Sequence, residues 1–379
     1  MSLEESVLIK LIKQSQFGAT ESIDFSCVDM DLLYTEAVQQ AVHGLVAAEI
    51  PLEYLSDKWI QVKDKQVFDF FRYCHAQDEL SDLLKKNNIA FVVIKGSASA
   101  IYYRDPTLRN MGDIDILVSQ ESYDLTKKLL ASSDYVEVRD NGRHSVFKKD
   151  KFIFEVHHHF SHEIDLENWI VNGLDNREHA SIDGHDFPML SKLANGLVLL
   201  DHFRRHLQAA IGLRQAIDWM MYVYRNLDDE FWIKYFKPVV QEKGMEKLAV
   251  TLTRMCQLYL GLPNNISWCN CGDEELCRLI LDSTLSTGNF GSKSGAGKTI
   301  ESVGVTFMRE GFFSRLQHAG ERNWGAYKSH HFLKPLCWIY QLLRYVLRGF
   351  KSGRTFKQIK SDNYRSKKRY ELIQKLMSQ

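Results

Sequence analysis

The stretch that decides the fold runs Ala90-Phe91-Val92-Val93-Ile94-Lys95-Gly96-Ser97, and Asp113-Ile114-Asp115-Ile116-Leu117-Val118 follows it. Both parts contain a short apolar, β-branched run of the kind found in buried strands. The first run ends at a glycine turn, after which residues 97–103 suit a short helix. We therefore predict a strand over 90–94, a helix over 97–103 and a second strand over 114–118.

The sequence on either side of this stretch indicates a small sheet enclosed by helices. An amphipathic helix is predicted over 121–132, and three strands follow over 135–139, 145–148 and 152–157. Tight turns are expected at Asn141-Gly142 and Asp150-Lys151. Apolar residues at helical spacing predict further helices over 59–86, 191–211, 213–227, 229–243, 246–260, 273–285 and 332–348.

These elements predict an α+β fold, in which a small mixed β-sheet core is flanked by helical segments. The expected parts are an N-terminal helical segment (1–86), the core (87–189), a helical C-terminal domain (190–350) and a basic tail (351–379). The tail contains nine basic and two acidic residues.

The composition excludes several classes of protein. The chain of 379 residues has 48 basic and 48 acidic side chains, so no overall charge favours nucleic acid, and no sequence-specific nucleic-acid partner is expected. An odd number of cysteines, seven, favours reduced thiols and a cytoplasmic location. The first ten residues do not resemble a signal peptide. The closest candidate for a membrane span, Phe332 to Phe350, is interrupted by Lys334, Arg344 and Arg348.

Three carboxylates suggest a metal site. Asp113 and Asp115 are two residues apart at the start of a strand, so both side chains lie on one face. Adjacent carboxylates repel unless a cation lies between them, and Mg²⁺ prefers such ligands together with substrate phosphates. Glu155 interrupts the apolar strand 152–157 and shares its face with His157. A buried strand glutamate requires a partner, so we expect Glu155 to complete the site.

The glycine turn suggests a phosphate site next to these carboxylates. Gly96 allows close approach of the backbone, and Ser97 begins a helix whose free amides favour an anion. The Ser97 hydroxyl adds a further donor. Together with the carboxylates, the turn predicts phosphoryl or nucleotidyl transfer supported by two metal ions.

The same residues carry a family resemblance. Val93-Ile94-Lys95-Gly96-Ser97, Tyr103-Arg104-Asp105-Pro106 and Arg109-Asn110-Met111-Gly112-Asp113-Ile114-Asp115-Ile116-Leu117-Val118 resemble the bacterial "uncharacterised nucleotidyltransferase" family of the polymerase-β-like nucleotidyltransferase superfamily. Looser similarity covers Glu155-Val156-His157-His158, His202 through Arg214 to Asp218, and Gly288-Asn289-Phe290-Gly291.

The resemblance implies Mg²⁺-dependent transfer of a nucleoside monophosphate from an NTP, ATP included, to a hydroxyl acceptor. Two Mg²⁺ ions, with Mn²⁺ as the alternative, would bind Asp113, Asp115 and Glu155, and Gly96 and Ser97 would bind NTP phosphates. The acceptor stays open among a small molecule, a sugar, a lipid and a protein. Members often resemble parts of bacterial surface-polysaccharide systems.

Other candidates each have a structural alternative. Lys95 and Arg109 suit triphosphate binding, or are surface cations. His157 suits a position near the metals, as a supporting residue or a base. The cluster His157, His158, His159 and His162 lacks the convergence that zinc requires, because consecutive strand residues face opposite ways.

The helical region offers a further set of candidates. His202, His206 and Arg214 lie on a helical face that suits closure over the nucleotide, whereas Arg214 and Asp218 at i, i+4 also suit an intrahelical ion pair. Residues 294–299 lack the glycine that a P-loop requires. Cys269, Cys271 and Cys277 lack zinc spacing.

Two non-enzymatic alternatives remain open. One is a nucleotide-binding module without catalysis. The other is a membrane-associated interaction protein, in which the helix 335–348 and the basic tail make peripheral contact with an anionic membrane.

Overall fold

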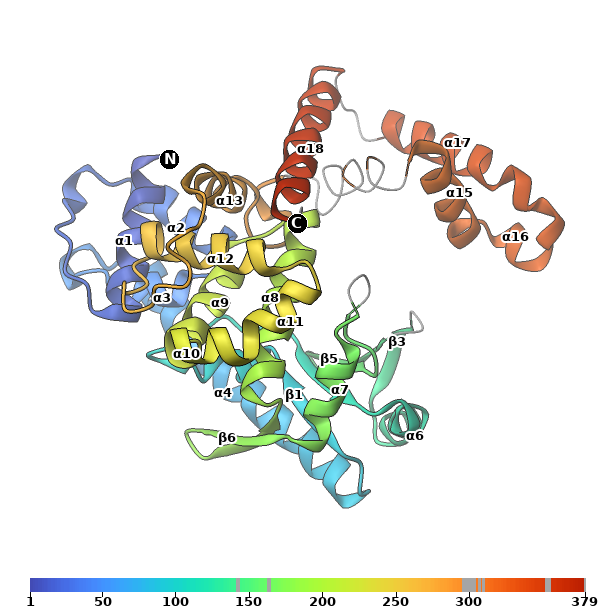
Figure 1. Cartoon of the computed structure of the whole chain (residues 1–379), viewed down its shortest axis with the longest axis horizontal. Coiled ribbons are helices and arrows are strands. Elements are labelled where there is room, and N and C mark those ends of the chain that lie inside the picture. Colours follow the sequence, from blue (N-terminus) through green and yellow to red (C-terminus); the bar gives the residue numbers. More distant parts are fainter. Residues whose placement is uncertain are drawn as a thin grey trace.

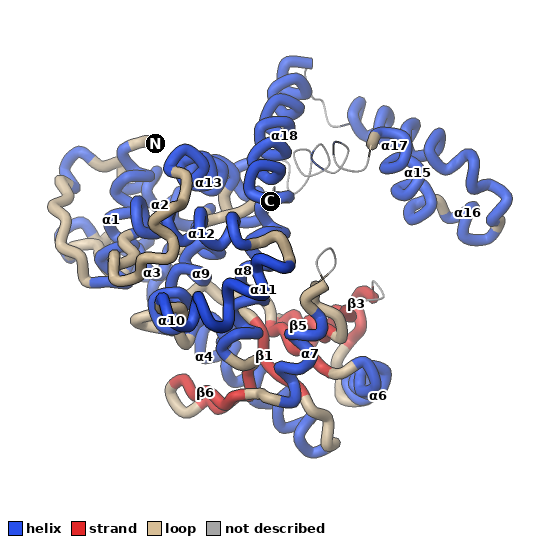
Figure 2. The backbone as a smooth tube through the Cα atoms, in the orientation of Figure 1, coloured by secondary structure: helices blue, strands red, loops and turns tan. Residues whose placement is uncertain are grey.

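The computed structural model describes residues 1–140, 144–161, 165–294, 305, 308, 311–351 and 356–377. Its centre is one mixed sheet of seven strands in the order β3-β4-β5-β2-β1-β7-β6 (Figure 1). The strands are β1 (Phe91–Ile94), β2 (Ile114–Val118), β3 (Val136–Asp140), β4 (His144–Lys149), β5 (Phe152–His157), β6 (Glu178–Ile182) and β7 (His185–Met189). The strands gather in one region and helices form the rest (Figure 2). The predicted α+β fold is confirmed.

Two of these strands were missed by the sequence prediction. β6 and β7 form an antiparallel hairpin, in which Ala180 lies opposite Phe187. The turn between them is Asp183-Gly184, and both residues have positive φ, 49° and 85°. An aspartate–glycine pair is a strong signal for a two-residue hairpin, but the flanking segments contain few β-branched residues and Pro188 lies within β7. The hairpin extends the sheet because β7 pairs with β1 in parallel.

Of the N-terminal helices, α4 covers one side of the sheet. The N-terminal helices are α1 (Leu3–Phe17), α2 (Met30–Gln39), α3 (His43–Ala47) and α4 (Asp57–Lys86). The long helix α4 was predicted nearly in full. It buries Phe70, Leu80 and Leu84, and Tyr73 packs its ring edge-on against Phe152 of β5. Because Phe152 and Glu155 point to opposite faces of β5, α4 covers the face away from the predicted carboxylate site.

Shorter helices connect the strands, and a larger helical body follows them. The connecting helices are α5 (Gly96–Ala100), α6 (Gln120–Ala131) and α7 (Glu167–Asp175). The body contains α8 (Lys192–Ala209), α9 (Leu213–Asn226), α10 (Asp229–Phe231), α11 (Lys237–Glu242), α12 (Glu246–Met255) and α13 (Glu274–Thr287). Single π-helical segments at Trp232–Phe236 and Cys256–Leu260 extend α10 and α12. The core of this helical body includes the fully buried side chains of Trp219, Tyr222 and Phe236.

The C-terminal residues are more helical than predicted. After a 3₁₀ turn at Asn289–Ser294 come α15 (Phe312–Asn323), α16 (Gly325–Ser329), a 3₁₀ turn at His331–Leu336, α17 (Cys337–Lys351) and α18 (Phe356–Met377). The region predicted only as a basic tail therefore contains the long helix α18, which buries Leu372, Ile373 and Leu376 against α8, α12 and α13. Among the described helices, none has the length and apolar character to cross a bilayer.

Some sequence predictions fall outside the described residues. These are the turn at Asn141-Gly142, His162 of the histidine cluster, and residues 295–299 of the rejected P-loop.

Candidate functional site

The site is organised by the parallel pairing of β2 and β5. In this register Asp115 lies beside Glu155, and Leu117 lies beside His157. Glu155 and His157 are two residues apart on one strand, so they share the face of the sheet on which Asp115 also lies. The structure therefore brings Glu155 next to Asp115, on the strand that neighbours β2.

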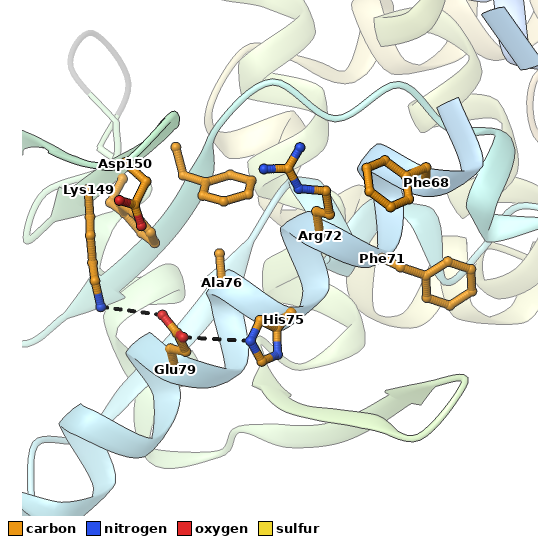
Figure 3. A pocket seen from close by; sticks show the side chains of 10 residues that line it. Phe68, Phe71, Arg72, His75, Ala76, Glu79, Lys149 and Asp150 are labelled. Carbon is orange, nitrogen blue, oxygen red and sulfur yellow. Dashed lines mark hydrogen bonds and ion pairs between the residues drawn. The ribbon is translucent and has the colours of Figure 1, made fainter. Parts of the chain in front are cut away.

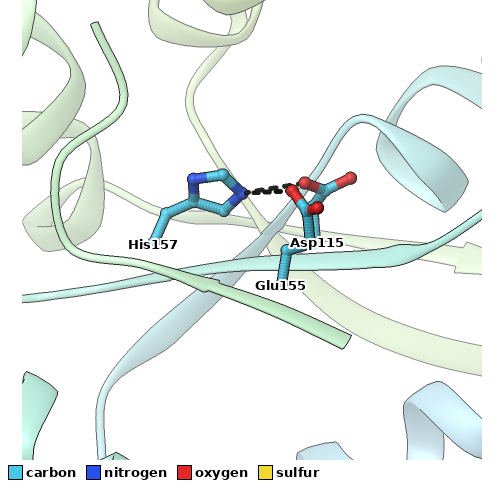
Figure 4. A group of neighbouring side chains, drawn as sticks. All are labelled: Asp115, Glu155 and His157. Atoms are coloured by element: carbon cyan, nitrogen blue, oxygen red, sulfur yellow. Dashed lines mark hydrogen bonds and ion pairs between the residues drawn. The ribbon is translucent and has the colours of Figure 1, made fainter. Parts of the chain in front are cut away.

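The three side chains form a compact cluster (Figure 4). One ligand atom from each of Asp115, Glu155 and His157 lies within 4.8 Å of the others. Nε2 of His157 is 2.9 Å from Oδ1 of Asp115 and 3.4 Å from Oε2 of Glu155. The second oxygen of Asp115, Oδ2, is buried without a hydrogen-bond partner among the described residues. A buried carboxylate oxygen without a partner is energetically costly, which marks this atom as a position for a cation.

Lys95 adds a positive charge to the cluster. Ile94 lies opposite Asp115 in the β1–β2 pair, and Lys95 follows with φ 56° and ψ −136°, a conformation that non-glycine residues rarely adopt. Its Nζ is 2.5 Å from Oδ1 of Asp115. Burial opposes ionisation of both groups, but the surrounding opposite charges together outweigh it. Lys95 and His157 hold the pKa of Asp115 below its ordinary value, and Asp115, Glu155 and Asp113 hold the pKa of Lys95 above its own.

Asp113 lies at the edge of this cluster. It directly precedes β2 and lines the cavity above the sheet, but its carboxylate is not in the group within 4.8 Å. The negative charge of Asp115 and, after it, burial raise the pKa of Asp113 to about 6. The structure therefore places two of the three predicted ligands in one cluster, with His157 beside them and Asp113 at the cavity wall.

The glycine turn contributes backbone rather than the expected hydroxyl. Gly96 has φ 32° and lines the cavity. The hydroxyl of Ser97 is buried and donates to Oε1 of Gln77 at 2.9 Å, which holds the turn against α4. At this turn Lys95 and Gly96 line the cavity, and the hydroxyl of Ser97 does not.

Arg109 is part of a buried polar network. Its Nε and Nη2 donate to the two carboxylate oxygens of Asp218 at 2.7 and 2.8 Å, and the hydroxyl of Tyr103 donates to the same carboxylate at 2.7 Å. The alternative of an intrahelical Arg214–Asp218 ion pair is wrong, because the carboxylate of Asp218 is directed across to Arg109. Arg109 lines the cavity, but its bidentate pairing gives it a positioning role there.

Arg214 is placed differently from Arg109. Its Nη1 donates to the carbonyl oxygen of Asn110 at 3.2 Å, while its buried Nε has no hydrogen-bond partner among the described residues. Burial and, after it, the charge of Arg109 lower the pKa of Arg214. A guanidinium in these surroundings would be stabilised by an anion in the cavity.

Two histidines of α8 face the cavity. The ring centroids of His202 and His206 lie 4.4 Å apart, edge to face. Burial lowers the pKa of His202 far below its ordinary value and that of His206 to about 3.

Two members of the predicted cluster that contains His157 have partners of their own. His158 contacts Gln120 and His159 contacts Glu167.

Several cavity residues were missed by the sequence analysis. Arg205 lies 4.5 Å from the ring centroid of Phe160 and pairs with Asp201, and Arg139 and His144 come from β3 and β4. Phe290 belongs to the Gly288-Asn289-Phe290-Gly291 segment, where Phe290 itself has φ 52°. The sequence analysis included this segment in the looser family resemblance but gave Phe290 no role.

Many of these groups line one cavity of about 480 Å³ between the sheet and the helical body. Acidic side chains of the sheet form one part of its lining, and basic side chains lie around them. The lining residues are Lys95, Gly96, Arg109, Gly112, Asp113, Arg139, His144, Glu155, His157, His202, Arg205, His206, Arg214 and Phe290. This volume and charge pattern suit a polyanionic ligand of nucleotide size together with cations.

A second cavity lies on the opposite face of the sheet. It has a volume of about 360 Å³ and is lined by α4 and β5, with Phe68, Phe71 and Arg72 at its wall (Figure 3). Two acidic residues line it, Glu79 and Asp150, and Glu79 pairs with both Lys149 and His75. It has no arrangement comparable to the carboxylate cluster.

Fold and site together define a nucleotidyltransferase-type protein. A family model described as "Uncharacterised nucleotidyltransferase" matches residues 26–261, and the chain belongs to this family. This confirms the resemblance found in the sequence. No curated protein matches the chain.

One solved structure also matches, the crystal structure of an antigenic nucleotidyltransferase-like protein from Paracoccidioides brasiliensis. It shares 17% sequence identity with a TM-score of 0.29, and the match covers 49% of this chain and 92% of that chain.

Proposed function

We propose that this chain transfers a nucleoside monophosphate from an NTP to a hydroxyl acceptor with the help of divalent cations. The observation that carries the proposal is the pair of Asp115, which is buried, and Glu155, which is partly buried, in register on parallel strands. Oδ2 of Asp115 has no hydrogen-bond partner among the described residues, and its neighbours Lys95, Glu155 and His157 line a basic cavity. Two carboxylates side by side, one of them buried, are costly for a fold and are expected where a cation binds.

The donor set fits divalent metal ions. Asp115 and Glu155 provide hard oxygen ligands, Asp113 adds a third at the cavity wall, and Mg²⁺ or Mn²⁺ prefers this chemistry. Such ions neutralise phosphate charge and increase the acidity of a hydroxyl. His157 lies against both carboxylates and orients them through its Nε2 contacts.

Residues around the carboxylates are proposed to bind the triphosphate. Lys95 and Arg214 provide cations, and Gly96 with the main chain of Ser97 provides close backbone approach. Arg109, fixed by Asp218, positions the segment that leads into Asp113. Arg205 and Arg139 extend the positive lining, so the cavity offers charge to all parts of the polyphosphate.

Phe290 is proposed to stack on the nucleobase. Its ring is 40% exposed, lies over the guanidinium of Arg214 at 5.6 Å and meets the ring of His206 at 5.0 Å. The turn that carries it is held by a hydrogen bond between Gln215 and Asn289 at 2.8 Å. A held aromatic ring at a cavity mouth suits stacking with a base.

In the proposed reaction the acceptor oxygen attacks the α-phosphorus. The bond from this phosphorus to the bridging oxygen breaks, pyrophosphate leaves, and the proton of the hydroxyl passes to a base. We assign the role of this base to His157, whose Nε2 lies 3.4 Å from Oε2 of Glu155. The acceptor itself is proposed only as a hydroxyl compound.

The test is pyrophosphate release from each of the four NTPs with Mg²⁺, in the presence of sugar, lipid and protein acceptors. We expect release with at least one acceptor, and its loss in Asp115→Asn. Glu79→Gln, a carboxylate change on the opposite face, is the matched control and should retain activity. Tight NTP binding without pyrophosphate release under any acceptor would instead favour a nucleotide-binding module.

A further inference from the structure

The helix α17 and the residue before it expose a strip of apolar side chains to solvent. Leu336, Ile339, Leu343, Val346 and Leu347 follow helical spacing, and their exposed fractions are 46%, 37%, 57%, 47% and 62%. Residues at i, i+3, i+4 and i+7 lie on one helix face, so these side chains form a continuous strip. A strip of this kind differs from singly scattered exposed residues, which are common on protein surfaces.

The inner face of the same helix is already occupied by α15. Leu316 and Ala319 of α15 are buried, and so are Cys337 and Gln341 of α17. Gly320 lies so close to the carbonyl of Cys337 that a Cβ would be 2.0 Å from its oxygen. The two helices therefore pack against each other through their inner faces. The apolar strip lies on the outer face of α17, which α15 does not cover.

The strip lies in a basic part of the chain. Residues 311–350, which include the hairpin of α15 and α17 except its last residue, contain six lysines and arginines and one acidic residue, whereas the whole chain is neutral. Figure 1 shows α15, α16 and α17 at one end of the molecule, away from the sheet. An exposed apolar strip on a segment of net positive charge matches an anionic lipid surface.

We propose that the hairpin of α15 and α17 docks on an anionic bilayer, with the strip from Leu336 to Leu347 inserted among the lipids. The proposal places the contact on α17 rather than on the tail, because α18 already buries its apolar residues Leu372, Ile373 and Leu376 in the helical body. At 15 residues α17 lies along the surface and does not span it. Docking is independent of the proposed nucleotidyl transfer.

The experiment measures partition of the full chain with vesicles of phosphatidylcholine alone and with added phosphatidylglycerol. We expect binding to the anionic vesicles that weakens as salt rises, because the attraction of basic groups is screened. The double variant Leu343→Glu/Leu347→Glu should bind at least about tenfold less. Lys334→Glu, which reverses one exposed charge of the hairpin, should also reduce binding.

The matched control is Leu52→Glu, at a residue 86% exposed in the N-terminal region. It should bind like the unaltered chain, and circular dichroism should show all variants folded. Equal binding to both kinds of vesicle, no binding to either, or unchanged binding of the double variant would overturn the proposal. A concentration-dependent dimer that the double variant abolishes, without vesicle binding, would overturn it in favour of a second copy on this face.

Discussion

Proteins usually bury apolar side chains and expose charged ones. The carboxylate cluster of the sheet and the outer strip of α17 both depart from this rule, and they do so in opposite ways. In the cluster, Asp115 and Glu155 place charge inside the protein. On α17, Leu343 and Leu347 place apolar surface outside it. Neither arrangement stabilises the isolated fold.

This contrast separates two kinds of binding. A cation lowers the free-energy cost of a buried charge with an unpaired oxygen. A medium that excludes water lowers the cost of an exposed apolar surface. The two regions share no residues, so changes in one should leave the property of the other intact. Each prediction below tests one side of that separation.

The largest effect is expected from Glu155→Gln. The change retains size but removes one of the two carboxylate charges of the cluster, so metal-supported charge stabilisation is lost. We expect the rate of transfer to fall about 10²- to 10³-fold, the range for loss of one electrostatic contact in an active site. Vesicle binding should not change. Pyrophosphate release measured for both proteins at saturating Mg²⁺ checks this, and a rate within twofold of the original would contradict the site.

The next effect concerns stability at the cavity wall. Asp218→Ala leaves Arg109 buried without its carboxylate, and we expect the free energy of unfolding to fall by about 3–5 kcal/mol. Tyr103→Phe removes only one hydrogen bond to the same carboxylate and should cost about 0.5–1.5 kcal/mol. Urea unfolding of both variants provides the comparison. Equal effects would show that the buried ion pair is not what holds this wall.

The ion pair of Arg109 and Asp218 could not be predicted from the sequence. The spacing of Arg214 and Asp218 suggested a local ion pair, but the carboxylate binds Arg109, whose position depends on the tertiary fold. By contrast, Glu155 was predictable, since a glutamate inside an apolar strand has few uses other than pairing with the aspartates.

The remaining errors have similar causes. The β6–β7 hairpin was missed although Asp183-Gly184 marks it, because its short strands lack a clear alternating pattern. The role of the Ser97 hydroxyl depends on Gln77 of a distant helix, which no local pattern indicates. The exposure of the α17 strip likewise depends on which face α15 covers.

A smaller effect is expected at the mouth of the cavity. Phe290→Ala removes the proposed stacking surface and should raise the Kd for NTP about tenfold, within the range of about 1–3 kcal/mol for base stacking. Phe290→Trp retains a flat ring and should restore binding. Fluorescence titration with a labelled NTP measures all three proteins. Weakening of binding that Phe290→Trp does not rescue would assign Phe290 to the structure of its turn.

The smallest effect is expected on α17. Leu343→Glu lies on an exposed face and should change the free energy of unfolding by no more than about 0.5 kcal/mol. Leu316→Ala, on the buried face of the same hairpin, should destabilise the hairpin by about 2–5 kcal/mol. Urea unfolding followed by tryptophan fluorescence, with Trp338 and Trp324 in the hairpin, compares them. A large loss of stability in Leu343→Glu would show that the strip packs within the protein.

The central claim is that Asp115 and Glu155 bind divalent cations together with a nucleoside triphosphate. Isothermal titration of an NTP into the metal-free protein, with and without Mg²⁺, tests it most directly. The account predicts binding that Mg²⁺ strengthens in the unaltered chain and in Glu79→Gln, and that Mg²⁺ no longer strengthens in Asp115→Asn. Equal Mg²⁺ dependence in the unaltered chain and in Asp115→Asn would contradict it.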